Sequence, residues 1–166
     1  MAHVAGDAAF AHGGVVAQRP AAGAGRIAVV VSRFNAPVTD RLFAGAVATL
    51  LDHGISADQI DAVQVPGAVE LPLAAASYAR SGGYAAIIAL GCVIRGETSH
   101  FDYVCQAATD GIMRVQLDHH IPVGFGLLTV ESEQQAWNRA GVPLTKERNA
   151  GSDAAVAALE LASLLS

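Results

Sequence analysis

From residue 26 onward, short apolar runs alternate along the chain with longer segments whose apolar residues recur at helical spacing. The short runs are rich in Val, Ile and Ala, which predicts buried strands at residues 27–32, 61–65, 85–93 and 122–130. The longer segments predict helices. One begins near Asn35 and Pro37 and stops at Gly54, and the others span residues 71–81, 101–119, 132–140 and 153–165.

This alternation is typical of βαβ units, in which the strands run parallel and right-handed crossovers place helices on both faces of the sheet. We therefore expect a three-layer α/β/α sandwich, flavodoxin-like in type, with a central, mostly parallel four-stranded sheet. It would form a single domain over residues 26–166. Residues 1–25 lack periodicity and are rich in Ala and Gly, which predicts a flexible N-terminal arm.

Composition narrows the class of protein. The chain has 166 residues, of which 52% are hydrophobic, and this content favours a folded core over disorder. A net charge of −5 argues against a nucleic-acid binder. No apolar run is long enough to span a bilayer, and no signal peptide is apparent, so a cytoplasmic location is the expectation. The only cysteines, Cys92 and Cys105, lack the spacing of a disulfide scaffold or zinc site.

The segment from Gly91 to His100 (GCVIRGETSH) offers the richest chemistry, because it leads from a buried strand through a turn into a helix. Backbone N–H groups at a helix start favour an anion, and Thr98 and Ser99 add hydroxyl donors. The spacing nearly matches a nucleotide-binding loop, but Glu97 replaces the lysine, which favours a single phosphate monoester. His100 is a candidate proton shuttle, with a capping or core histidine as the alternative.

Three other residues lie at expected strand or helix ends, and each could have either a structural role or a role in binding a ligand. Phe34 could stack on a flat heterocycle or make a contact between loops. Glu70 and Arg139 could complement helix dipoles, Glu70 at the start of a helix and Arg139 late in the fourth one. In a functional role, Glu70 would accept hydrogen bonds from a polyol or an amine. Arg139 would reach a phosphate.

The last helix, residues 153–165, is apolar nearly all round, which predicts a homo-oligomer that covers the excess surface. The sequence contains no GxSxG, HExxH or GxGxxG motif and no carboxylate cluster with metal spacing.

Five segments together resemble the lumazine synthase (6,7-dimethyl-8-ribityllumazine synthase) family. They are SRFN at 32–35, PGAVELP at 66–72, GCVIRGETSHFDYV at 91–104, PVGFGLLT at 122–129 and EQQAWNRAG at 133–141. The resemblance implies condensation of 5-amino-6-(D-ribitylamino)uracil with 3,4-dihydroxy-2-butanone 4-phosphate, the penultimate step of riboflavin biosynthesis. It implies no metal or organic cofactor, and riboflavin synthase as a protein partner.

The resemblance also implies roles for individual residues. His100 would transfer protons, and Phe34 would stack on the pyrimidine. The ribityl chain would meet Ala68, Val69 and Glu70, while Cys92, Val93 and Ile94 would line the pyrimidine slot. The substrate phosphate would be held by Gly96, Glu97, Thr98 and by Arg139. In the family the site is shared between subunits, so Phe125 and Arg139 would come from a neighbouring copy.

The sequence departs from the family pattern at three places. Val69 stands where many relatives have an aromatic residue, and Ala150 stands where relatives often have a lysine, for which Lys146 or Arg148 could substitute. The connection between Arg139 and Asn149 is longer than is usual in capsid-forming relatives. We therefore expect a pentamer, with a sixty-subunit shell as the alternative. Two rival functions are a non-catalytic flavin or lumazine carrier and a shell-forming assembly protein.

Overall fold

Four parallel strands form one sheet in the part of the chain that the computed structural model describes, residues 25–166. The strands are β1 (Arg26–Ser32), β2 (Ile60–Val65), β3 (Tyr84–Ile94) and β4 (Val123–Val130). Their order across the sheet is β2-β1-β3-β4. Every neighbouring pair is parallel, which confirms the predicted architecture and makes this sheet parallel throughout.

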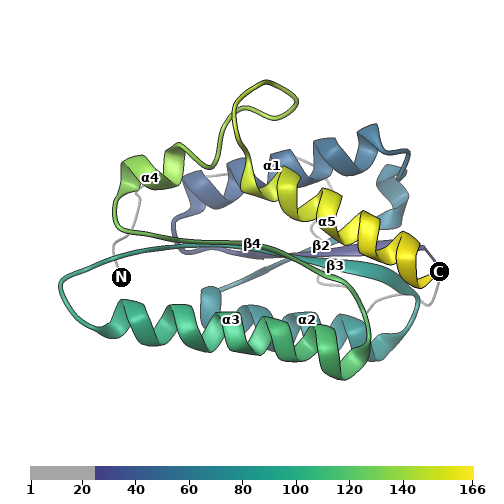
Figure 1. Ribbon diagram of the computed structural model, residues 1–166, viewed down its shortest axis with the longest axis horizontal. Helices are drawn as coiled ribbons and strands as arrows, with labels where there is room; N and C mark the ends of the chain where they lie inside the picture. The colour runs from purple at the N-terminus through teal and green to yellow at the C-terminus, as the bar shows by residue number, and fades with distance from the viewer. Residues whose placement is uncertain (1–24) are drawn as a thin grey trace.

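Helices cover both faces of the sheet (Figure 1). They are α1 (Ala36–Asp52), α2 (Leu71–Ser81), α3 (His100–His119), α4 (Glu133–Trp137) and α5 (Ala150–Leu165), with two short 3-10 helices, η1 (Ala57–Gln59) and η2 (Ala68–Glu70). Alternate residues of each central strand point to opposite faces. Val29 and Val31 therefore join the core under α1 and α5, and Ala28 and Val30 join the core under α2 and α3.

The fourth helix is shorter than predicted and the last helix begins earlier. Helix α4 ends at Trp137 because the chain then turns back on itself, where Ala140 and Asn149 form an antiparallel bridge. The N–H of Ala150 donates to the carbonyl of Arg139 at 2.8 Å within the same turn. Arg139 thus follows the helix instead of lying late within it. This long-range pairing leaves no trace in the helical pattern of the sequence.

Asn149 starts α5 and fastens it to α1. Its side-chain oxygen accepts a hydrogen bond from the N–H of Ser152 at 3.0 Å, a standard helix cap. Its amide nitrogen donates to the carbonyls of Gly141 at 2.8 Å and Arg41 at 3.1 Å. The buried amide packs against Gly45, where a Cβ atom would overlap it, so this position of α1 requires glycine.

The amino ends of three strands are tied together by Arg26, Asp61 and Tyr84. The Nε of Arg26 donates to the Asp61 carboxylate at 2.8 Å, and the Tyr84 hydroxyl donates to the same carboxylate at 2.6 Å. The Tyr84 ring also meets the edge of Tyr78, with centroids 5.1 Å apart. One carboxylate therefore joins the amino ends of β1, β2 and β3. This amino edge of the sheet lies opposite the carboxyl ends of the strands, where a ligand is expected to bind.

The predicted arm at residues 1–25 lies outside the described residues except for Gly25, so it stays a prediction, as does the division into an arm and one domain. Among residues 25–166, no helix is both long enough and apolar enough to cross a membrane.

Candidate functional site

The loops that follow the four strands lie at the same end of the sheet, because parallel strands all end on the same side. We call this end, formed by the carboxyl ends of the strands, the carboxyl edge. The strand register aligns Ser32 with Val65 and Ile94 with Val130, so the strand ends are level within each of these two pairs. Backbone hydrogen bonds continue one residue further: the N–H of Arg33 donates to Val65 at 2.8 Å, and that of Arg95 donates to Val130 at 2.9 Å. The segments that the sequence singled out are therefore neighbours in pairs.

The first loop holds Phe34 between β1 and α1. Phe34 is half-buried, and its N–H donates to the carbonyl of Pro66 at 3.2 Å, which brings it beside the second loop. The next residue, Asn35, adopts a left-handed conformation with φ 60° and is buried. Its side-chain amide donates to the carbonyl of Cys92 at 2.9 Å, so it fastens this loop to the end of β3 instead of capping α1.

The second loop folds Ala68, Val69 and Glu70 into the short helix η2, which lies against α3 and β3. Ala68 is buried in the same core as Val93 and Phe101. Val69 and Glu70 are exposed, and Glu70 lies at the start of α2 as the sequence predicted. This loop thus presents one carboxylate and one aliphatic side chain beside the end of β3.

Cys92, Val93 and Ile94 form the buried end of β3, which extends beyond the end of β1. Burial raises the pKa of the Cys92 thiol to about 12, so the thiol is neutral at physiological pH. A thiolate is the form that attacks an electrophile, so a buried thiol with a raised pKa is a poor nucleophile.

The third loop, Gly96 to Ser99, leads into α3. Gly96 is half-buried, while Glu97, Thr98 and His100 are exposed. The Thr98 hydroxyl accepts a hydrogen bond from the N–H of His100 at 3.3 Å, and Ser99 occupies the N-cap position without a side-chain cap bond. His100 is the first residue of α3, so it belongs to the turn whose N–H groups open a helix of 20 residues.

Two predicted residues lie outside the three loops described above, one on β4 and one after α4. Phe125 pairs with Ala89 in the middle of β4, five residues before Val130, which corresponds to about 17 Å at about 3.3 Å per residue. It lies on the edge strand with 46% of its surface exposed. Arg139 follows α4, and its Nη1 donates to the carbonyl of Gln135 at 3.0 Å. The guanidinium therefore does complement the end of that helix.

A cluster around Arg95 was missed by the sequence reasoning. Its Nε donates to Glu131 at 2.6 Å, and its two Nη atoms donate to the two oxygens of Asp102 at 3.2 and 3.1 Å. The guanidinium carbon lies 4.3 Å from the centroid of the Phe101 ring. The hydrogen bonds to Asp102 and Glu131 raise the pKa of Arg95 above its ordinary value. The available signal was an arginine at a strand end followed by an aspartate in the first turn of the next helix.

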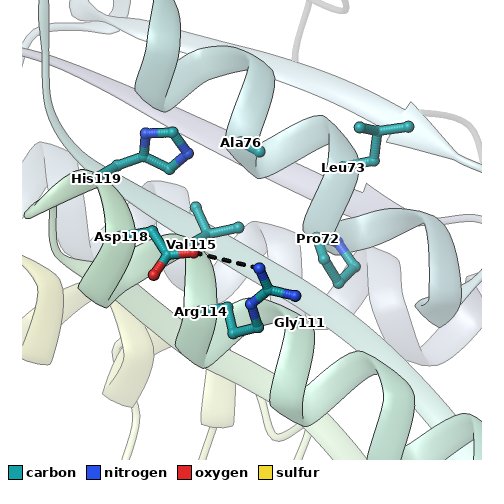
Figure 2. A pocket seen from close by; sticks show the side chains of 8 residues that line it. All are labelled: Pro72, Leu73, Ala76, Gly111, Arg114, Val115, Asp118 and His119. Carbon is teal, nitrogen blue, oxygen red and sulfur yellow. Dashed lines mark ion pairs between the residues drawn. The ribbon is translucent and has the colours of Figure 1, made fainter.

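A separate groove of about 350 Å³ lies between α2 and α3, and Figure 2 shows its lining. The groove is lined by Pro72, Leu73, Ala76, Gly111, Arg114, Val115, Asp118 and His119, none of which is a predicted site residue. Arg114 and Asp118 form an exposed ion pair at 3.6 Å on α3. The described residues also contain no group of three His, Cys, Asp or Glu side chains that could hold a metal ion.

A comparison with protein-family models decides the family. Residues 24–166 match the model described as 6,7-dimethyl-8-ribityllumazine synthase. The chain belongs to this family. The resemblance found in the sequence is thereby confirmed, and it implies that the chain is a family enzyme of the lumazine-forming step of riboflavin biosynthesis. Lumazine synthases act on small molecules, and the carboxyl edge of the sheet is where a parallel α/β fold provides a site for them.

Proposed function

We propose that this chain condenses 5-amino-6-(D-ribitylamino)uracil with 3,4-dihydroxy-2-butanone 4-phosphate to give 6,7-dimethyl-8-ribityllumazine. The observation that carries the proposal is the family match over residues 24–166, which includes the whole GETSH loop. The amine of the uracil attacks the ketone, water leaves as an imine forms, phosphate is eliminated, and ring closure releases a second water. Because both reactants already carry the reactive groups, the protein supplies alignment and proton transfer.

In this proposal the phosphate binds to the N–H groups of Gly96, Glu97 and Thr98. The loop geometry supports it, because the start of α3 is exposed and the helix dipole favours a dianion there. His100 lies at the first position of the same helix and transfers protons during imine formation and phosphate elimination. An imidazole serves this purpose because it can both accept and donate a proton near neutral pH.

The uracil substrate is proposed to bind between the first two loops and the end of β3. Phe34 stacks on the pyrimidine, and the chain around Cys92, Val93 and Ile94 lines its edge with backbone groups. Glu70 accepts hydrogen bonds from the ribityl hydroxyls, beside Ala68 and Val69. The hydrogen bonds from Phe34 to Pro66 and from Asn35 to Cys92 support this arrangement, because they hold the first two loops and the end of β3 together.

We further propose that the complete site lies between two copies in a pentamer. Phe125 lies in the middle of β4, about 17 Å from the end of that strand, which supports a role at the neighbour's site. For Arg139 the role at the neighbour's site rests on the resemblance to the family. Large apolar side chains are exposed on α2 and α3, as oligomer contacts require: Leu73, Tyr103, Met113 and Leu117. Sedimentation at micromolar concentration should give a five-fold mass, and a monomer would contradict the shared site.

Turnover tests the proposed reaction. The purified chain is mixed with both substrates, and the fluorescent lumazine and the released phosphate are followed together. We expect the two products to form in equal amounts, faster than without protein. No acceleration at high protein concentration would contradict the enzyme and favour a carrier. The cytoplasmic location and the partnership with riboflavin synthase stay predictions.

A further inference from the structure

Arg95 connects three segments around the loop that is proposed to bind phosphate. Its own N–H belongs to the sheet ladder through Val130, and its side chain reaches Asp102 in the first turn of α3 and Glu131 after β4. Residues 96–99 lie between Arg95 and α3. The side chain of the residue before the loop therefore holds the helix turn that follows the loop.

The guanidinium is fixed in position and in plane. The bond to Asp102 uses both carboxylate oxygens, which is the arrangement that most restricts an arginine. The Glu131 contact holds the remaining edge, and one face stacks on Phe101, whose ring is buried in the core under α2 and α3. Rotation about the side-chain bonds would break at least one of these contacts.

The same cluster is a poor anion site by itself. One positive charge faces two carboxylates, so the net charge of Arg95, Asp102 and Glu131 is −1. A phosphate near this guanidinium would meet two negative charges already in contact with it. A direct phosphate contact by Arg95 is therefore disfavoured, and its effect on binding must pass through the loop.

We propose that Arg95 is a positioning residue that sets the spacing between the N–H groups of residues 96–98 and the imidazole of His100. This inference rests on the proposed function, since it assigns the phosphate to that loop. Without the clamp, the loop and the first turn of α3 would sample several arrangements, and fewer of them would align all N–H groups on one phosphate. Binding of the uracil substrate is proposed to depend on Phe34, on residues 68–70 and on the end of β3, and should be affected little.

The main test compares Arg95→Met with Arg95→Lys. Methionine keeps an apolar stem over Phe101 but removes every donor, whereas lysine keeps the charge without the planar fork. For Arg95→Met we expect the KM for the butanone phosphate and the dissociation constant of inorganic phosphate to rise about tenfold each. The KM for the uracil substrate should change less than about twofold, and Arg95→Lys should recover only part of the loss.

Glu131→Gln separates positioning from direct contact by the sign of its effect. Positioning predicts weaker phosphate binding, because the hydrogen bond from the Nε of Arg95 loses its charged acceptor and that side of the clamp weakens. A direct Arg95–phosphate contact predicts tighter binding, because the guanidinium is released from a competing carboxylate. Glu133→Gln is the matched control: it removes a nearby exposed charge that contacts Trp137 and not Arg95, and it should leave phosphate binding unweakened.

The outcomes are distinguishable from failure of the proposed reaction. Phosphate affinity is measured by titration calorimetry with inorganic phosphate, so it does not depend on turnover, and melting temperatures confirm folding. Unchanged phosphate affinity in Arg95→Met, an equal loss for both substrates, or tighter binding in Glu131→Gln would overturn the positioning role. If wild-type protein bound phosphate but made no lumazine, the proposed reaction would fail while the positioning role could still be measured.

Discussion

The two edges of the sheet each hold an arginine that joins several segments, but the surroundings of the two differ. At the amino edge, the Arg26 and Asp61 side chains are 24% and 20% exposed and link three strands with Tyr84. At the carboxyl edge, Arg95 is 37% exposed, and its partners Asp102 and Glu131 are 58% and 59% exposed. The first cluster joins three strands, whereas the second joins the end of β3 to α3 and to the residue after β4.

From this difference in exposure we expect the amino-edge cluster to matter for stability and the carboxyl-edge cluster for substrate binding. Exposed ion pairs contribute little to the free energy of unfolding, because water and salt screen them, whereas hydrogen bonds to a shielded carboxylate contribute more. We therefore expect changes at the amino edge to lower stability and leave catalysis intact. Changes at the carboxyl edge should affect substrates and leave stability nearly unchanged.

His100→Ala should have the largest effect and act on catalysis alone. Loss of a general acid–base group typically costs about 100- to 10,000-fold, and here we expect a fall in turnover of at least about 100-fold while uracil binding barely changes. Steady-state kinetics with lumazine fluorescence measures both. His119→Ala, at the exposed opposite end of α3, is the matched control. A normal rate in His100→Ala would remove His100 from the mechanism.

Arg139→Ala tests whether the carboxyl-edge site needs the positive charge of Arg139 to bind the substrate phosphate. Its loss should raise the KM for the butanone phosphate about 10- to 100-fold, the usual range for a charge-assisted hydrogen bond. The KM for the uracil should change little, and Arg80→Ala, an exposed arginine on α2, should be neutral. A constant KM for the phosphate substrate would mean that the phosphate lies elsewhere.

Asp61→Asn should be the strongest change at the amino edge. Loss of the charged acceptor should lower the free energy of unfolding by about 1–3 kcal/mol, because Arg26 and Tyr84 lose their shared partner. Urea unfolding measures the loss, while turnover at low temperature stays normal. A fall in turnover without a loss of stability would contradict the separation of the two edges.

The same variant has a defined pH dependence. Burial acts to raise the pKa of Asp61, but hydrogen bonds from Arg26 and Tyr84 and the charge of Arg26 outweigh it and hold the pKa below its ordinary value. The stabilisation is therefore present above the unfolded pKa of about 3.9 and is lost as pH falls through the folded pKa. The difference between wild type and Asp61→Asn should accordingly narrow in acid, and a difference that widens would contradict this assignment.

Tyr84→Phe should have the smallest effect. It removes the hydroxyl that donates to Asp61 at 2.6 Å but keeps the edge contact with Tyr78. We expect a loss of about 1 kcal/mol in the free energy of unfolding, since Arg26 still satisfies the carboxylate. Urea unfolding measures the loss, and a loss as large as that of Asp61→Asn would place the stabilisation on Tyr84 and not on the ion pair.

Much of the fold followed from the sequence, because its signals are local. Buried parallel strands such as residues 85–93 appear as apolar runs, and glycines such as Gly54 mark helix ends. The errors came from contacts between distant residues. The end of α4 depends on the Ala140–Asn149 bridge, and the start of α5 depends on a buried asparagine whose other partners are on α1 and at Gly141.

The candidate site was predictable in position but not in its internal connections. The sequence placed Phe34, Glu70 and His100 at strand ends, and the parallel order of the strands brings those ends to one edge. Asn35 precedes the first residue of α1, as its interpretation as a helix start predicted, but nothing local in the sequence showed that its side chain holds the end of β3. The cluster around Arg95 was not predicted, because Glu131 follows β4 and approaches Arg95 and Asp102 only in the folded chain.

Mixing of variant subunits tests the central claim, a condensation site built from two copies, most directly. His100→Ala and Arg139→Ala are coexpressed, the mixed oligomers are purified, and lumazine formation is measured with the butanone phosphate far below its wild-type KM, where a loss of Arg139 lowers the rate. The account predicts about a quarter of wild-type activity, because random assembly places an intact His100 beside a neighbour's intact Arg139 in about one site in four. Activity no higher than the mean of the two separate variants would contradict the account.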